Sequence, residues 1–193
     1  VNLSISDTKS PRLESLLAFY GRRPLVKKGT LPRGIMAQIS EGSQNRFEEL
    51  RNEIEQSLEE MIASRVNSGE VVELAGRMLL AGGKRLRPIM MFLAYELAGG
   101  KNPDDLMPLA KAFEFLHTAT LVHDDIYDEA THRRGVPTIH TEHGLAKAII
   151  VGDWLFVQGY ALGGRYNQEI VTIIGNYCSE IAVSEFSQIE HIN

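Results

Sequence analysis

The hydrophobic positions along most of the chain recur every three or four residues, the period of an α-helix. From about residue 44 this pattern predicts an amphipathic helix, whose apolar stripe is Phe47, Leu50, Ile54, Leu58 and Ile62. The same period predicts further helices over 69–80, 88–98, 104–130, 144–162 and 168–192. No stretch alternates apolar and polar residues well enough to predict a sheet. We therefore expect an all-α antiparallel helical bundle.

Glycine pairs and prolines mark the ends of these predicted helices. The pairs stand at 82–83, 99–100 and 163–164, while Pro88 and Pro108 suit the first turn of a helix. The apolar run over 145–162 approaches the length of a membrane span, but charged and polar side chains interrupt it. We interpret this run as a buried helix and expect no transmembrane segment.

The composition is that of a globular domain. The 193 residues are 44% hydrophobic and 23% charged, so they can bury a substantial core. A net charge of −5 argues against general nucleic-acid binding, which needs a basic face. Cys178 is the only cysteine, which excludes a disulfide framework. We expect a soluble cytoplasmic domain.

The charge is unevenly distributed along the chain. Residues 1–40 carry seven basic and two acidic side chains, a net charge of +5, and the remainder carries −10. Two interpretations of the basic segment stay open, a remnant of a targeting segment or a flexible, loosely docked extension, and the second is favoured. We divide the chain into a basic arm, residues 1–43, and a helical domain, residues 44–193.

The most informative stretch is 121–128, LVHDDIYD, with Arg133 and Arg134 just beyond it. On a helix, Asp124 and Asp128 form an i,i+4 pair with Cβ atoms roughly 5–6 Å apart, and such like charges repel unless a cation lies between them. Hard oxygen ligands that leave most of the coordination shell open suit Mg²⁺ bound together with substrate phosphates. The two arginines can hold phosphate oxygens bidentately. This pattern predicts a diphosphate site.

A second basic segment lies upstream, at 82–88, GGKRLRP. Its glycines allow close approach of the backbone to a ligand, and the helix that follows offers free N–H groups to an anion. Lys84 and Arg87 are three residues apart and can point to one side. His117 lies about two helical turns before Asp124, on nearly the same face. These residues indicate a second anion site beside an apolar interior.

Four segments, placed separately, together resemble the trans-isoprenyl diphosphate synthases, or polyprenyl synthetases: GGKRLRP at 82–88, HTA at 117–119, HDDIYD at 123–128 and RRG at 133–135. The resemblance runs from about residue 45 to the end of the chain. Softer matches stand at 151–155 and 184–188. The resemblance implies a bundle of the isoprenoid synthase type and head-to-tail condensation of isopentenyl diphosphate with an allylic diphosphate. A homodimer is expected from the resemblance alone.

The resemblance also implies roles for individual residues. Asp124 and Asp128 resemble the Mg²⁺ ligands that hold the allylic diphosphate, and Asp125 supports the same cluster. Arg133 resembles the arginine on the allylic diphosphate. The residues that resemble the isopentenyl diphosphate contacts are Lys84, Arg87, His117 and Arg134.

Product length is expected to depend on how far the prenyl tail runs before it meets a bulky side chain. Thr120 and Ala119, four and five residues before Asp124, are both small, and Leu116 and Phe113 are candidates for a deeper floor. We therefore expect a product longer than the fifteen-carbon farnesyl chain, and a shorter product when Ala119 is replaced by Phe.

The chain also departs from the family it resembles. It has no Asp after Asp153 and no Lys after Lys147, so the second aspartate-rich motif and a lysine of the family are absent. We expect a fragment of a complete enzyme. The alternative is a naturally short partner subunit of a heteromeric synthase, either non-catalytic or dependent on a complete subunit.

Two other functions stay open. A terpene cyclase also ionises an allylic diphosphate beside an aspartate-rich helix, but it does not need the second anion site. A metal phosphohydrolase would draw on His123 and Asp124 together with some of the histidines His117, His132, His140 and His143.

Overall fold

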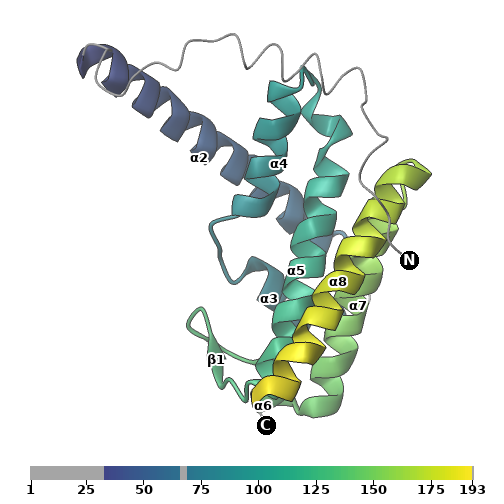
Figure 1. Ribbon diagram of the computed structural model, residues 1–193. Coiled ribbons are helices and arrows are strands. Elements are labelled where there is room, and N and C mark those ends of the chain that lie inside the picture. Colours follow the sequence, from purple (N-terminus) through teal and green to yellow (C-terminus); the bar gives the residue numbers. More distant parts are fainter. Residues whose placement is uncertain (1–32, 66–68, 193) are drawn as a thin grey trace. The chain divides into compact units, whose positions relative to one another are not determined.

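The computed structural model describes residues 33–65 and 69–192, whose regular structure is almost entirely helical (Figure 1). The longer helices are α2 (Arg33–Ala63), α3 (Glu70–Leu80), α4 (Leu86–Leu97), α5 (Met107–Tyr127), α7 (Leu145–Gly163) and α8 (Gln168–Ile192). Short elements lie between them: η2 (Pro103–Asp105), α6 (Ile139–His143), β1 (His132–Arg133) and β2 (Val136–Pro137). The predicted all-α fold is confirmed.

The chain divides into two units, Val1–Gln44 and Asn45–Asn193. Helix α2 begins at Arg33, inside the segment predicted as a basic arm, where no apolar stripe indicates a helix. Met36, Ala37 and Gln38 have good helix propensity, which explains how the helix continues there without a stripe. The predicted flexible or loosely docked character of residues 1–32 lies outside the described residues.

The apolar stripe predicted for α2 is buried in the second unit. Leu50, Ile54 and Leu58 are each 0% exposed, and Phe47 and Ile62 pack against the same core. Burial of each such side chain stabilises the fold by about 1.5–3 kcal/mol. The stripe therefore fixes which side of this helix faces the bundle.

Helix α5 is the central element of the second unit. It contacts α3, α4, α6 and α7, and its contact with α7 is the most extensive between any two described elements. Phe115 and Val122 of α5 are buried in one cluster with Val151 and Leu155 of α7. Because the site residues lie along α5, this packing sets their direction.

By length and composition alone, α7 is the one described helix that could cross a membrane. One side of α7 packs against α5, as in the core of a helical bundle. Its other side exposes Ile149, Ile150 and Val157. The predicted burial of this helix therefore holds for one face only.

A β-hairpin that the sequence pattern did not predict follows α5. The register pairs His132 with Pro137 and Arg133 with Val136, which leaves Arg134 and Gly135 as a two-residue turn. Both turn residues have positive φ, 51° and 82°, as a type I′ turn requires. Strands of two residues are too short to produce a visible alternation, so only the turn could have indicated them.

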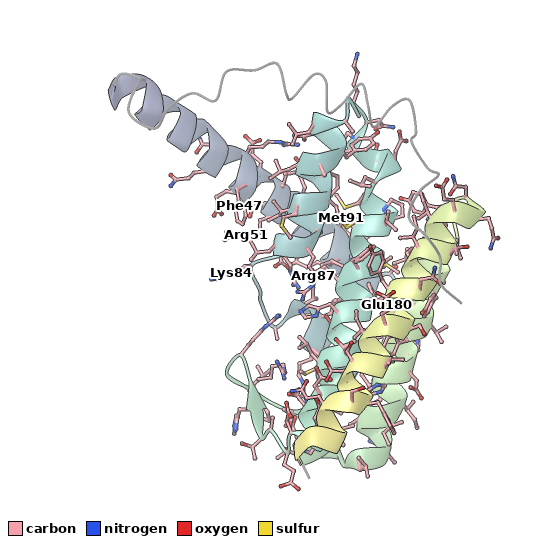
Figure 2. The ribbon with its side chains drawn as sticks, viewed as in Figure 1. Phe47, Arg51, Lys84, Arg87, Met91 and Glu180 are labelled. Atoms are coloured by element: carbon pink, nitrogen blue, oxygen red, sulfur yellow. The ribbon has the colours of Figure 1, made fainter. Side chains whose placement is uncertain are left out.

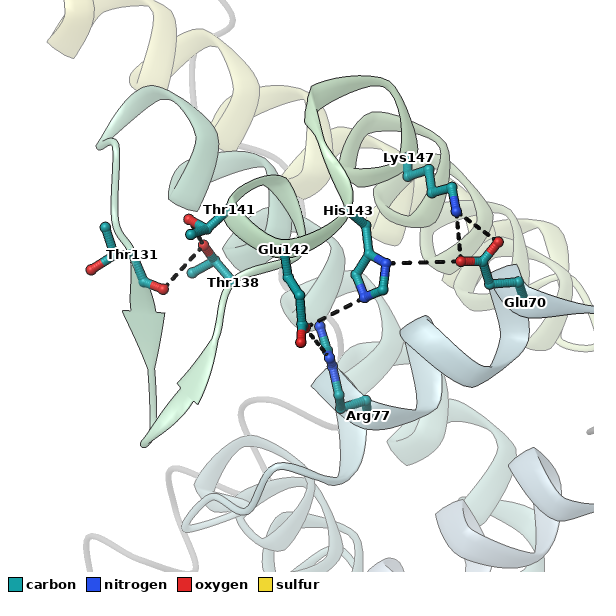
Figure 3. A network of polar contacts seen from close by, with 8 residues as sticks. All are labelled: Glu70, Arg77, Thr131, Thr138, Thr141, Glu142, His143 and Lys147. Atoms are coloured by element: carbon teal, nitrogen blue, oxygen red, sulfur yellow. Dashed lines mark hydrogen bonds and ion pairs between the residues drawn. The ribbon is translucent and has the colours of Figure 1, made fainter.

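Polar contacts hold the base of this hairpin against the bundle (Figure 3). The hydroxyl of Thr138, which is fully buried, donates to the carbonyl of Ala130 at 2.7 Å. Helix α6 is tied to α3 because Arg77 donates to Glu142. Lys147 at the start of α7 binds both carboxylate oxygens of Glu70 at 2.6 and 2.8 Å. These contacts fix the loop that carries Arg133 and Arg134.

Arg85 connects the elements around the glycine turn. It is 3% exposed and has a left-handed backbone, with φ of 48°. Its guanidinium donates to Glu55 of α2 at 2.8 and 3.0 Å, to Glu114 of α5 at 2.7 Å and to the carbonyl of Leu79 at 2.7 Å. Because a buried charge is tolerated only when it is paired, this network holds the 82–88 segment beside α5.

Candidate functional site

The three predicted aspartates gather at the C-terminal end of α5. Asp124 lies in the last turn, and the N–H of Asp128 at the cap donates to the carbonyl of Asp124 at 2.9 Å. The negative end of the helix dipole disfavours carboxylates at this position. Burial, the charge of Glu185 and the charge of Asp128 together raise the pKa of Asp124. A cation bound beside Asp124 would offset the negative charges of Glu185 and Asp128.

Asp125 differs from its two neighbours because it faces inward. It is 2% exposed, the Nε atom of Arg133 donates to its Oδ1 at 2.7 Å, and the Nη2 atom forms an ion pair with the same oxygen at 2.7 Å. Burial raises the pKa of Asp125, although Arg133 opposes that shift. Its Oδ2 is buried and has no hydrogen-bond partner among the described residues. Such an oxygen is available to a cation or to an ordered water molecule.

The hairpin sends the two adjacent arginines in different directions. Arg133 pairs with Asp125 at the acidic end of α5. Arg134 donates instead to the carbonyl of Gly82, and a Cβ on Gly83 would lie 3.0 Å from its guanidinium. The I′ turn therefore splits the arginine pair between the acidic end and the glycine turn.

The residues that resemble the isopentenyl diphosphate contacts line one pocket of about 530 Å³, here called the basic pocket. Its wall includes Gly82, Gly83, Lys84, Arg87, His117 and Arg134. Lys84 and Arg87, beside the start of α4 (Figure 2), have no acidic partner within residues 33–65 and 69–192. Their charges remain available to an anion.

A second, largely apolar cavity of about 970 Å³ adjoins the first. It is lined by α4, α5 and α8, with Asp124, Tyr127 and Glu185 among its polar residues. Arg87 and His117 line both the basic pocket and this apolar cavity. A diphosphate in one pocket and a hydrocarbon chain in the other would therefore meet beside the same two side chains.

The predicted tail-pocket residues separate into two sets. Phe113, Leu116 and Thr120 line the apolar cavity. Ala119 does not, which corrects the prediction, because its side chain is fully buried in the core. Positions 113, 116 and 120 share a helix face, whereas position 119 is rotated by about 100° from position 120. The small side chain at Ala119 serves packing of α5 and not the cavity wall.

Sequence reasoning gave no role to a contact between α5 and α8. The hydroxyl of Tyr127 donates to Glu185 at 2.8 Å, and this hydrogen bond, with burial, raises the pKa of Tyr127 to about 12. Both residues line the apolar cavity beside Asp124. They are 58 residues apart, so no local pattern could have paired them. Arg85 was missed as well, because its burial depends on acids from α2 and α5.

Of the histidines considered for phosphohydrolase chemistry, His117 and His123 line the apolar cavity with Asp124, whereas the other three do not. His143 lies 3.4 Å from Glu142 and 3.8 Å from Glu70, within the network that ties α6 to α3 (Figure 3). In the described part of the chain, no group of three or more His, Cys, Asp or Glu residues is placed to hold a metal ion. Any ion bound by the aspartates of α5 would therefore have to take further ligands from substrate or water.

Comparison with known proteins defines the class. A sequence profile of the polyprenyl synthetase family matches residues 69–193, and the chain belongs to this family. It is 40% identical over 119 residues to geranylgeranyl diphosphate synthase from Sulfolobus acidocaldarius, covering 60% of this chain and 36% of that protein. Solanesyl diphosphate synthase 1 from Arabidopsis thaliana is 36% identical over 124 residues, covering 61% and 30%.

Solved structures agree in fold. Polyprenyl synthase from Caulobacter crescentus, complexed with calcium and isoprenyl diphosphate, has a TM-score of 0.67 and 36% identity, covering 75% of this chain and 45% of that one. A geranyltranstransferase from Thermotoga maritima has a TM-score of 0.66 and 27% identity, covering 72% and 53%. The chain thus spans about half the length, or less, of these relatives.

The pKa of His117 should respond to an anion in the basic pocket. Burial, followed by the charges of Arg87 and Arg134, lowers the pKa of His117 from 6.5 to about 4. The folded state therefore binds fewer protons than the unfolded state, and the contribution of this residue to stability falls as pH drops from 6.5 to 4. Inorganic pyrophosphate in the basic pocket would offset the cationic field and raise the pKa. NMR titration of the His117 imidazole measures its pKa without and with pyrophosphate. Identical titration curves would contradict the predicted anion site.

Proposed function

We propose that this chain carries the substrate-binding centre of a trans-prenyl diphosphate synthase, which joins isopentenyl diphosphate head-to-tail to an allylic diphosphate. The supporting observation is the meeting of two unlike pockets at Arg87 and His117. The basic pocket suits the diphosphate of isopentenyl diphosphate. The apolar cavity suits the tail of the allylic substrate, with its diphosphate beside Asp124. Relatives named as geranylgeranyl and solanesyl diphosphate synthases support this reaction class.

The acidic end of α5 fits a divalent cation, and we assign Mg²⁺ to it. Carboxylates at the negative end of a helix and the unpartnered Oδ2 of buried Asp125 are the observations that favour a cation. Asp124 and Asp128 are the residues that would hold it, while Arg133 keeps Asp125 in position. When bound, Mg²⁺ neutralises the charge that develops on the departing diphosphate.

The reaction needs no protein nucleophile. The allylic C–O bond breaks, the electron pair leaves with the diphosphate, and an allylic cation remains. The double bond of isopentenyl diphosphate attacks that cation, a C–C bond forms, and loss of a proton restores an alkene. Lys84, Arg87 and Arg134 hold the second diphosphate so that its alkene faces the cation, and the apolar walls exclude water.

The basic pocket also separates this proposal from a terpene cyclase. A cyclase acts on one diphosphate and has no use for a second group of unpaired cations. In this chain Lys84 and Arg87 lack acidic partners among the described residues and line the basic pocket, and only Arg87 also reaches the apolar cavity. Two substrates with a diphosphate each account for both pockets.

Metal-dependent binding tests the proposal without requiring turnover. Calorimetry should detect uptake of geranylgeranyl S-thiolodiphosphate that depends on Mg²⁺. Asp124→Asn should weaken it about 10- to 100-fold, because a ligand to the cation is lost. The control is Asp104→Asn in η2, an exposed carboxylate outside both pockets. If the two variants behave alike, or the unmodified chain shows no metal dependence, the proposed site is wrong.

Product length follows from the cavity wall, and we propose a product longer than farnesyl. Thr120 lines the apolar cavity one turn from Asp124, so Thr120→Phe should obstruct the tail there. The variant should lose affinity for geranylgeranyl S-thiolodiphosphate and keep it for the dimethylallyl analogue. Phe113→Ala, farther along the same wall, is the matched variant and should favour the longer analogue. An unchanged preference in both would remove the assigned wall.

We also propose that this chain binds a second polypeptide chain, a second copy being the first expectation and a complete synthase subunit the alternative. Ile149, Ile150 and Val157 on α7, and Tyr177 and Phe186 on α8, are large apolar side chains exposed to solvent. Contiguous exposed apolar surface marks interaction sites. Sedimentation of the chain alone should give a dimer mass; a monomer both alone and mixed with a complete synthase would refute the proposal.

A further inference from the structure

His123 occupies a slot in α7 that exists because residue 152 is glycine. A Cβ built on Gly152 would overlap the imidazole ring of His123, with Cε1 only 2.9 Å away. The ring therefore lies directly against the bare backbone of α7. Since α5 and α7 make the most extensive contact of the described bundle, this slot lies in the central interface of the fold.

Neighbouring residues of α7 complete the slot. The Nε2 atom of His123 lies 3.3 Å from the carbonyl oxygen of Ile149 and 3.7 Å from a carboxylate oxygen of Asp153. The ring of Phe156 packs with its centroid 5.7 Å from that of the imidazole. A carbonyl oxygen can only accept, so the hydrogen bond requires the proton on Nε2. The slot thus holds one orientation of the ring.

The slot matters because His123 directly precedes Asp124. On its other side, Asp125 is held by Arg133 of the hairpin. The carboxylate of Asp124 makes no hydrogen bond or ion pair within the described residues, yet Asp124 lines the apolar cavity. Two anchored neighbours therefore fix the rotation of the last turn of α5, while Asp124 keeps both oxygens free for a ligand.

We infer that Gly152 and His123 are positioning residues that aim Asp124 at the cation of the proposed site. The inference rests on the proposed function, since it assigns Asp124 to a divalent cation. Groups that orient a ligand without touching the metal commonly change metal affinity by about 10- to 100-fold. Substitutions that fill or empty the slot should therefore lower the affinity for the metal ion more than they lower the stability of the fold.

A general loosening of the helix pair is the competing explanation, and the chain provides a control for it. Gly159, two turns along α7, also lies in the interface, where a Cβ would meet Cγ of Leu116 at 2.7 Å. Gly159→Ala would push the same helices apart far from the aspartates. Gly175 has nothing within 4 Å of a built Cβ, so Gly175→Ala reports the effect of helix propensity alone.

The experiment titrates Mg²⁺ by calorimetry into the protein with dimethylallyl S-thiolodiphosphate, whose short tail does not depend on the wall at Leu116. We expect Gly152→Ala to weaken Mg²⁺ affinity about 10-fold or more. Gly175→Ala should leave the affinity unchanged, and Gly159→Ala should lower the melting temperature without that loss. Because Gly152→Ala could fail to fold, His123→Ala is measured in parallel and should show the same loss of Mg²⁺ affinity.

The double variant completes the design. With His123→Ala in place the slot is empty, so adding Gly152→Ala should cause no further loss. Three results would overturn the inference: unchanged Mg²⁺ affinity in His123→Ala, an equal loss in Gly159→Ala, or losses that add in the double variant. If the unmodified protein shows no Mg²⁺-dependent uptake, the proposed function fails instead, and the two failures are distinguishable.

Discussion

The close packing of α5 against α7 is the constraint on which the rest of this structure depends. Because Gly152 and Gly159 have no side chain, α7 can approach His123 and Leu116 of α5 closely. That approach fixes the rotation of α5, and the rotation decides which of its residues face the core and which face the two pockets. A helix packed more loosely could bury the same apolar stripe with its carboxylates turned elsewhere.

Charge is separated along α5 in a way that suits a phosphorylated substrate. Carboxylates gather at its C-terminal end, where the helix dipole opposes them. Lys84 and Arg87 in the 82–88 segment have no acidic partner among the residues that the structure describes. Arg85 belongs to the same 82–88 segment, but its guanidinium is paired with Glu55 and Glu114. The protein thus distinguishes a structural arginine from cations that stay available, although the two kinds are adjacent in sequence.

Backbone strain occurs at two arginines beside the glycine turn. Arg85 and Arg134 both have positive φ, 48° and 51°, a conformation that non-glycine residues adopt at a cost of about 1–3 kcal/mol. The first places its guanidinium in the buried network beneath the glycine turn, and the second places its guanidinium over Gly82 and Gly83. The basic pocket therefore depends on two arginines with a strained backbone. Arg85 follows the glycine turn in the sequence, and Arg134 reaches the same turn from the β-hairpin.

The sequence by itself predicted the longer helices from about residue 44 onward and the family. Apolar periodicity is a local property, so the stripe from Leu50 to Leu58 predicted its own burial. The motifs at 82–88, 123–128 and 133–135 predicted the residue types of the candidate site. Only the tertiary structure decided how these parts meet: Ala119 faces the core while Thr120 faces the cavity, and Arg133 and Arg134 separate. Contacts such as Tyr127 with Glu185 depend on helix rotation and on turn geometry, which the spacing of residues along a chain does not encode.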